Sequence, residues 1–275
     1  MMRGFTKEKY YHEIATHLTN LSVGSNFISG KQEVFAESSE KQAPVITVDG
    51  LSGSGKGTIA WMVAQALGWY VLDSGIIYRV IAWALLYYNV SLSNVEAVAF
   101  LLKRVQVMIA SYQPNKQPKV RLKVSCDGHD ITQAIRSKEC GIMASRASTL
   151  PLVRSAMLQY QRNFRRQPGL VADGRDMGTV VFPDASLKFF FNADLAVRAY
   201  RRCKQLQDQG INVRLRDIQE DLEERDRRDI SRSIAPTKPA NHAVVIDVTN
   251  LSLDEVFALV MRCVKQQLLD KGALL

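Results

Sequence analysis

The sequence has 275 residues, of which 47% are hydrophobic and 23% are charged, with a formal net charge of +9 at pH 7. This composition is typical of a globular chain and excludes disorder as its main state. No apolar run approaches the roughly 20 residues that a membrane-spanning helix needs, so no membrane association is expected. The first 30 residues contain no continuous apolar segment of the secretory type, and we therefore expect a cytoplasmic protein.

The four cysteines are Cys126, Cys140, Cys203 and Cys263. They are far apart and include none of the close pairs that metal sites and redox motifs use. The sequence therefore predicts reduced thiols.

Positive charge is also a property of nucleic-acid-binding proteins, because Lys and Arg neutralise phosphates. Most arginines, however, lie close to carboxylates. Nine arginines and one lysine between residues 198 and 232 are accompanied by eight acidic residues. Arginine held by carboxylates suits a discrete phosphate pocket better than a long polyanion, so no nucleic-acid partner is expected.

Residues 1–43 form a segment of balanced charge with only short apolar stretches. We expect a mobile N-terminal extension, in which residues 7–21 could form an amphipathic helix. The pattern changes at residue 44, where a second region begins that extends to residue 275.

Five apolar runs in this second region alternate with helical stretches. Both faces of each run are apolar, which is typical of parallel strands covered by helices on each side. The sequence therefore predicts an α/β fold around a five-stranded parallel sheet. Ligands of such sheets bind beyond the carboxyl ends of the strands, where Asp49, Asp73 and Asp173 lie. The runs cover residues 44–49, 69–73, 169–173, 187–192 and 243–248.

Two segments with alternating polarity interrupt this rhythm at residues 105–112 and 119–131. The turn-like sequence QPNKQP, residues 113–118, separates them. We predict an antiparallel hairpin inserted into the α/β frame.

A glycine-rich loop follows the first run directly and opens a helix with apolar periodicity. Its glycines allow consecutive backbone N–H groups to surround a polyphosphate, and its lysine adds a cation. The commonest form of the motif has Ser or Thr directly after the lysine, whereas here a glycine intervenes. The loop reads Gly50-Leu51-Ser52-Gly53-Ser54-Gly55-Lys56-Gly57-Thr58.

Two further segments place charged residues beyond strand ends. Asp73, Ser74 and Arg79 lie where the second run passes into a helix, which implies a second anion site. Arg175 lies between Asp173 and Asp176 after the third run, where it could bind phosphate while Asp176 accepts a hydrogen bond from a base. The alternative for this loop is a salt-bridged turn.

Four segments together resemble signature segments of bacterial cytidylate kinases, P-loop proteins of the nucleoside monophosphate kinase family. The resemblance extends from about residue 44 to the end. The segments, in the order of the family, are VITVDGLSGSGKGT, LDSGIIYR, ADGRDMGTVVFPDA and ERDRRD.

The resemblance implies transfer of the γ-phosphoryl group of ATP, accompanied by Mg²⁺, to CMP or dCMP in a monomeric enzyme. It implies a core of residues 44–73, 169–197 and 240–275, an acceptor-binding region of about 74–168 and a helical lid of about 198–232. Gly50 to Thr58 would hold ATP, although Thr58 could contact either Mg²⁺ or phosphate. No residue is assigned as a dedicated metal ligand.

Further roles follow from the resemblance residue by residue. Arg79 and Arg175 would bind the acceptor phosphate beside Asp73, Ser74 and Asp173. Ser145, Arg154 and Asp176 would contact the cytosine, Arg225 and Asp229 the sugar, and Arg232 a phosphate nearby. Arg201 and Arg202 would lie in the lid and, with Lys56 and Arg175, stabilise the transferring group.

Three alternatives remain at this point. The acceptor could be UMP or AMP. A GTPase is disfavoured because Asn115-Lys116-Gln117-Pro118 lacks the aspartate of the guanine signature. A nucleic-acid-binding protein is the third. The four histidines, His12, His17, His129 and His242, lie outside the signature segments, so we expect transfer without a histidine base.

Overall fold

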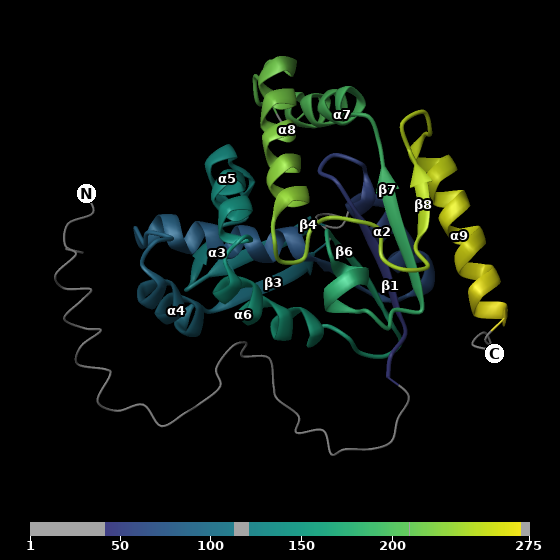
Figure 1. Ribbon diagram of the computed structural model, residues 1–275, viewed down its shortest axis with the longest axis horizontal. Helices are drawn as coiled ribbons and strands as arrows, with labels where there is room; N and C mark the ends of the chain where they lie inside the picture. The colour runs from purple at the N-terminus through teal and green to yellow at the C-terminus, as the bar shows by residue number, and fades with distance from the viewer. Residues whose placement is uncertain (1–41, 113–120, 209, 271–275) are drawn as a thin grey trace.

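The computed structural model describes residues 42–112, 121–208 and 210–270 (Figure 1). The predicted helix over residues 7–21 and the QPNKQP turn lie outside the described residues, as does nearly all of the predicted N-terminal extension.

The central sheet has five strands, and every neighbouring pair is parallel. The strand order is β2-β6-β1-β7-β8. The predicted α/β fold is therefore confirmed, with strand boundaries that differ by about one residue. The strands are β1 (Val45–Gly50), β2 (Tyr70–Asp73), β6 (Leu170–Gly174), β7 (Leu187–Asn192) and β8 (Val244–Asp247).

Helices cover both faces of this sheet (Figure 1). On one face, Ile46 and Val48 of β1 pack with α2 (Lys56–Leu67) and α9 (Leu253–Asp270). On the other face, Val45 belongs to a core shared with four helices. This alternation along β1 is the period of two that a strand buried on both sides requires. The four helices are α3 (Ser74–Tyr87), α4 (Val95–Arg104), α5 (Lys138–Ala147) and α6 (Pro151–Arg162).

The prediction that all five strands are buried on both faces is wrong for the two edge strands. Tyr70 of β2 is 39% exposed and Val245 of β8 is 57% exposed. An edge strand has no neighbour on one side, so the layers of helices cover it incompletely.

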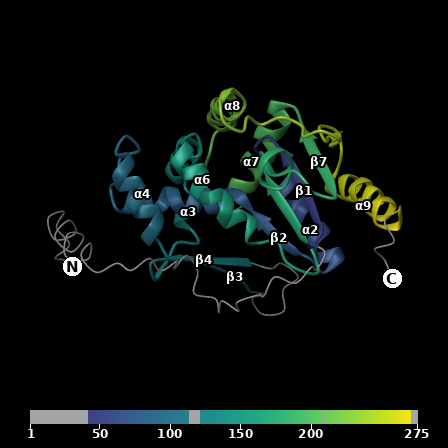
Figure 2. The ribbon, with the colours of Figure 1, turned by 60° about the horizontal axis from the view of Figure 1, so that its bottom comes forward.

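The inserted antiparallel element is confirmed, but it has three strands and not two. Figure 2 shows two of them, β3 and β4, apart from the central sheet. They are β3 (Val107–Tyr112), β4 (Arg121–Cys126) and β5 (His129–Asp130). The second predicted segment folds back at Asp127 and Gly128, whose φ angles are 48° and 80°. Two positive φ angles at Asp-Gly are typical of a tight hairpin turn, and this signal was missed inside a longer alternating run.

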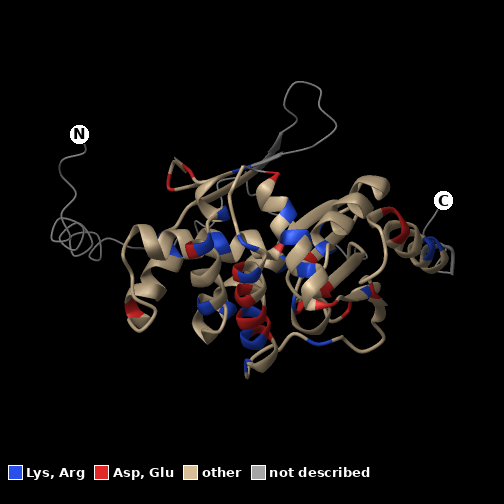
Figure 3. Cartoon of the chain, turned by 90° about the horizontal axis from the view of Figure 1, so that it is seen from above, with Lys and Arg blue, Asp and Glu red and all other residues tan. Residues whose placement is uncertain are grey.

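The helices α7 (Leu195–Gln207) and α8 (Leu215–Ser231) lie above the carboxyl end of β7 (Figure 1). They share a small apolar cluster of their own, which includes Ala199, Cys203 and Leu222. Basic and acidic residues are interspersed through the middle of the molecule (Figure 3). Among the described residues, no helix combines the length and apolar character needed to cross a membrane. All four cysteines are free, as predicted.

Candidate active site

The glycine-rich loop connects β1 to α2 at the carboxyl edge of the sheet. Gly50 has a φ of 144°, and a Cβ on it would lie 2.3 Å from the carbonyl oxygen of Phe191. The loop can therefore leave β1 beside β7 only with glycine at this position. Thr58 lies in the first turn of α2 and is exposed.

The position of Asp173 explains why glycine, and not Ser or Thr, follows Lys56 in the loop. A Cβ on Gly57 would lie 2.7 Å from Oδ2 of Asp173. A larger residue would push this carboxylate away from Lys56. The glycine after the lysine thus allows β6 to bring an acidic residue against the phosphate loop.

Lys56 is buried inside the loop. Its Nζ donates to the carbonyl oxygen of Leu51 at 3.1 Å and lies 4.0 Å from Oδ1 of Asp173. The pKa of Lys56 is lowered to about 8, mainly by burial and also by the charge of Arg175, while Asp173 opposes the shift. The ammonium group is therefore held where a polyphosphate in the loop would complete its coordination.

Two aspartates lie side by side beneath the loop, since Asp73 of β2 is opposite Asp173 of β6. Asp73 also caps α3, because its Oδ1 accepts from the Ile76 amide at 3.1 Å. Burial raises the pKa of Asp173 to about 7, although Lys56 opposes the shift. Its Oδ1 is buried without a hydrogen-bond partner.

These carboxylates fit a Mg²⁺ ion that is shared with phosphates. Magnesium commonly uses one or two protein carboxylates, substrate phosphate oxygens and water. Oδ1 of Asp173 makes no hydrogen bond and offers such a ligand. Among the described residues no group of three or more His, Cys, Asp or Glu could hold a metal, so phosphates would have to supply further ligands.

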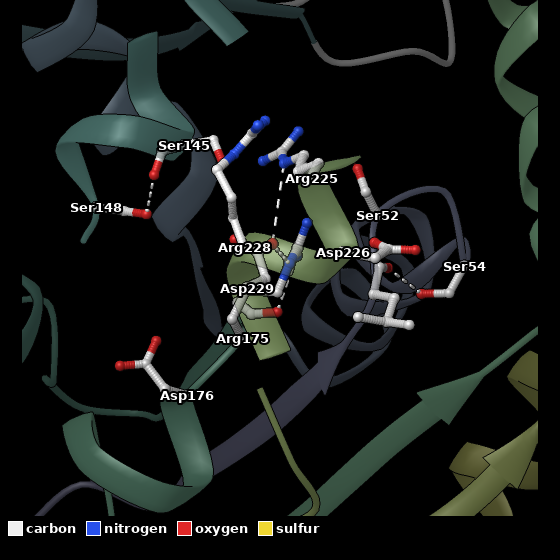
Figure 4. Close-up of polar contacts among 12 residues, drawn as sticks. Ser52, Ser54, Ser145, Ser148, Arg175, Asp176, Arg225, Asp226, Arg228 and Asp229 are labelled. Carbon is white, nitrogen blue, oxygen red and sulfur yellow. Dashed lines mark hydrogen bonds and ion pairs between the residues drawn. The ribbon is translucent and has the colours of Figure 1, made fainter. Parts of the chain in front are cut away.

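A cavity opens beside the glycine-rich loop, beyond the end of β6. It brings together seven of the residues predicted for the acceptor from four separate segments of the chain. Figure 4 shows arginines in the middle of this view, with Ser52 and Ser54 of the phosphate loop on one side and Ser145 on the other. The cavity is lined by Ser74, Gly75, Tyr78, Ala144, Ser145, Ser148, Arg175, Asp176, Arg225, Asp229 and Arg232.

Asp176 lines this cavity, and a buried ion pair with Arg154 holds its carboxylate in place. Arg154 also donates to the carbonyl oxygen of Ser148 at 3.3 Å, which fixes its guanidinium. The other carboxylate oxygen, Oδ1, lies 3.7 Å from Nη2 of Arg232, which has no hydrogen-bond partner. Asp176 and Arg232 therefore keep an acceptor and a donor free for a ligand.

Arg175, Arg225 and Asp229 form a second charged group. Nε of Arg175 donates to Oδ2 of Asp229 at 3.1 Å, and Nε of Arg225 lies 3.9 Å from the same oxygen. The pKa of Arg225 is lowered to about 10, mainly by burial and also by the charge of Arg175, while Asp229 opposes the shift. One carboxylate for two partly buried guanidinium groups leaves an excess of positive charge that an anion would neutralise.

The remaining predicted arginines lie at different places. Arg79 donates to the carbonyl oxygens of Ile135 and Ser137 at 2.6 and 3.3 Å. Nη1 of Arg202 donates to Oε1 of Gln205 at 2.8 Å, and burial lowers the pKa of Arg202, with the charges of Arg79 and Arg136 adding to the shift. The structure does not bring Arg201 to this group. Its Nη2 instead donates to the carbonyl oxygens of Val248, Thr249 and Leu251 at 2.8, 3.3 and 3.2 Å.

Two further arginines were not predicted from the sequence. Arg198 donates to the carbonyl oxygen of Ser52 at 3.0 Å and to Asp226 at 2.6 Å, so it ties the phosphate loop to α8. Nε of Arg228 donates to Oγ of Ser145 at 3.1 Å. Arg228 follows Arg225 by three residues, and this helical spacing could have placed it on the cavity face of α8.

Comparison with known proteins gives consistent matches. The family model described as cytidylate kinase matches residues 46–266. A cytidylate kinase of Coxiella burnetii (strain RSA 493 / Nine Mile phase I) is 67% identical over 228 residues, which cover 83% of this chain and 94% of that protein. A cytidylate kinase of Aeromonas salmonicida (strain A449) is 46% identical over 233 residues, which cover 85% of this chain and 99% of the relative.

Proposed function

The chain belongs to the cytidylate kinase family, and from this premise we propose that it transfers the γ-phosphoryl group of ATP to the 5′-phosphate of CMP or dCMP. One observation carries the proposal. A glycine-rich loop with a buried lysine lies beside a cavity in which a carboxylate and several arginines meet. UMP and AMP are less well suited as acceptors, because neither agrees with the family of the chain.

On the donor side, Gly50 to Thr58 would surround the ATP phosphates and Lys56 would face the transferring group. Its free ammonium hydrogens can bind phosphate oxygens without a change of position. Mg²⁺ bound to ATP would neutralise phosphate charge, and Asp73 and Asp173 would hold it, directly or through water. The exposed position of Thr58 supports a contact to phosphate or solvent as well as one to Mg²⁺.

On the acceptor side, Ser145, Arg154 and Asp176 would bind the base. Cytosine presents an amino donor beside acceptor atoms at N3 and O2. Asp176 can accept from the amino group, and Arg154 can donate to the acceptor atoms while it keeps Asp176 in place. Uracil has a carbonyl where cytosine has the amino group, so it would face the carboxylate with an acceptor.

The remaining arginines suit the sugar and the phosphate of the acceptor. Arg225 and Asp229 would contact the sugar, while Arg79, Arg175 and Arg232 would bind phosphate with support from Ser74. Nε of Arg225 and Nη2 of Arg232 are buried and take part in ion pairs but make no hydrogen bond. This supports the assignment, because a buried donor without a hydrogen bond is costly.

Transfer would be in line and direct, without a phosphoenzyme. The acceptor phosphate is already ionised at neutral pH, so no general base is needed. The protein would align the two oxygens and stabilise charge on the transferring group through Lys56, Arg175 and Arg202. Arg201 would support the ATP side from its position beside Val248 and Leu251.

We assign residues 74–168 to acceptor binding and residues 198–232 to a lid. The separate apolar cluster of α7 and α8 supports a lid that moves as a unit. The family match begins at residue 46, which supports a catalytic role for residues 44–275 without the first 43. We further propose a monomer in the cytoplasm, a location with which four free cysteines agree.

A panel of acceptors tests the proposal. ADP release from ATP and Mg²⁺ is measured with CMP, dCMP, UMP and AMP at equal concentrations, and light scattering gives the mass in solution. We expect CMP and dCMP to support turnover at least tenfold better than UMP or AMP. Preferential turnover of AMP or UMP would overturn the assignment of the acceptor.

A further inference from the structure

Asp49 is a buried carboxylate to which the reaction outlined above assigns no role. It is 2% exposed and directly precedes the phosphate loop in β1. Its two oxygens each accept one backbone hydrogen bond, Oδ1 from Met177 and Oδ2 from Gly178, both at 2.8 Å. A single side chain thus connects the donor half of the site to the segment that follows β6.

The two amides belong to the first turn of η3 (Met177–Val181), directly after Arg175 and Asp176. Amides in a first turn have no partner within the helix. A bidentate carboxylate satisfies both and fixes their position and direction. Because Arg175 and Asp176 directly precede Met177 in the chain, fixing the two amides also fixes the backbone of these two residues.

The buried carboxylate of Asp49 lowers the stability of the folded protein. The pKa of Asp49 is raised to about 7, mainly by burial, with the two amides opposing the shift and the neighbouring charges of Asp176 and Asp173 adding to it. A group that only filled space in this core would be more stable as an apolar side chain.

We propose that Asp49 is a positioning residue for phosphoryl transfer, which sets Arg175 and Asp176 at a fixed distance from the phosphate loop without touching either nucleotide. The inference rests on the proposed function, because the acceptor must be bound by Arg175 and Asp176. It adds to that function a physical connection between the donor loop and the acceptor loop.

Asp49→Asn removes one of the two bonds with little change in shape, since the amide nitrogen cannot accept from a backbone N–H. Thr47→Val is the matched control. Thr47 lies two residues earlier on the same face of β1, is fully buried, and its Oγ1 has no hydrogen-bond partner. Both variants alter the same strand face, but only Asp49→Asn changes the link to η3.

Steady-state kinetics are measured with CMP and ATP varied separately, after thermal unfolding has shown that each variant is folded. For Asp49→Asn we expect kcat/KM for CMP to fall about tenfold or more, the loss typical of one charged hydrogen bond, while KM for ATP changes less than about threefold. Thr47→Val should change both values less than about twofold.

A second pair of variants tests the same link through the Gly178 amide, which donates to Asp49, in case Asp49→Asn does not fold. A Cβ on Gly178 would lie 2.8 Å from Oγ1 of Thr47, so Gly178→Ala should push the amide away from Asp49. The double variant Thr47→Ala/Gly178→Ala removes this contact, the shortest one, and leaves those with Ala240 and Lys188 at 3.3 Å. We expect Gly178→Ala to raise KM for CMP and the double variant to restore most of the loss.

The outcomes separate this inference from the proposed function. If the wild type neither binds CMP in calorimetry nor phosphorylates it, the proposed function fails and the inference fails with it. If the wild type does both, two results would overturn the inference alone: a folded Asp49→Asn with unchanged CMP kinetics, or equal losses for CMP and ATP. Should Asp49→Asn not fold, an unchanged KM for CMP in Gly178→Ala would overturn it.

Discussion

The donor side and the acceptor side of the candidate site are built in different ways. The donor side is one continuous segment, Gly50 to Thr58, whose form comes from backbone N–H groups and glycine conformations. The acceptor side is assembled from α3, α5, the end of β6 and α8, with α6 supplying Arg154 behind it. Its side chains are held by ion pairs such as Arg154–Asp176 and Arg175–Asp229.

Because the two sides are built differently, we expect the donor side to determine the rate of phosphoryl transfer and the acceptor side to determine which nucleotide is phosphorylated. A polyphosphate is recognised by charge and by backbone donors, which a local motif can supply. A base must be recognised by donors and acceptors at fixed positions, and these positions require the tertiary fold. We therefore expect donor-side changes to affect turnover with any acceptor, and acceptor-side changes to affect the choice among acceptors.

The largest expected effect is that of Lys56→Ala. Loss of the buried ammonium removes a cation from the transferring group, so kcat should fall by about a hundredfold or more, equally for CMP and UMP. Gln65→Ala, on the exposed face of the same helix, should leave kcat within about twofold. Steady-state rates of ADP release check both. A loss restricted to CMP would contradict the division between the two sides.

The same difference decides how much could be predicted from the sequence. The phosphate loop and the five strands could be predicted within about one residue, because glycine spacing and apolar runs are local signals. The contact of Gly57 with Asp173 could not, since these residues are far apart in sequence and meet only because β1 and β6 are neighbours. The same holds for Asp49 with Met177 and for Arg198 with Ser52.

The second prediction concerns selectivity on the acceptor side. Asp176→Ala should lower kcat/KM for CMP by about tenfold or more and that for UMP by less, because only cytosine donates from its amino group. The discrimination between the two acceptors should therefore shrink. Kinetics with CMP, dCMP and UMP measure this effect.

Two comparisons make this test specific. Asp184→Ala also removes a carboxylate paired with an arginine, Arg165, but on the surface, and it should leave both acceptors unchanged. Arg154→Ala should impair CMP and leave KM for ATP nearly unchanged. It should also destabilise the fold by about 3–5 kcal/mol, because the buried Asp176 loses its partner. Equal losses of CMP and UMP in Asp176→Ala would remove it from base recognition.

On the donor side, the affinity for ATP should depend on pH. Since the pKa of Lys56 is lowered to about 8, the free enzyme loses this charge as pH rises through 8. The proposed ATP contact requires the charged form of Lys56, so the affinity for ATP should fall by up to about tenfold per pH unit above 8. Binding titrations from pH 7 to 9.5 measure the trend. Lys56→Arg keeps its charge in this range, so its affinity for ATP should vary much less.

The smallest effect is expected where the two sides are joined at the surface. Lys138 at the start of α5 forms an ion pair with Asp221 of α8 at 2.9 Å, and both residues are partly exposed. The pair lies on the same two helices as Ser145 and Arg228, which are hydrogen-bonded across the cavity. It therefore connects the acceptor region to the lid but touches neither proposed nucleotide site.

Because exposed ion pairs contribute about 0.2–1 kcal/mol, Asp221→Lys should change KM for CMP by about twofold to fivefold and leave kcat nearly unchanged. The double variant Lys138→Glu/Asp221→Lys restores opposite charges and should restore KM. Arg216→Glu/Glu220→Arg exchanges an exposed pair within α8 alone and should have no effect. The difference between wild type and Asp221→Lys should also shrink at high salt, because screening weakens exposed pairs. If the charge exchange does not restore KM, α5 and α8 are held together by the Arg228–Ser145 contact and apolar packing, and the ion pair does not contribute to closing the acceptor cavity.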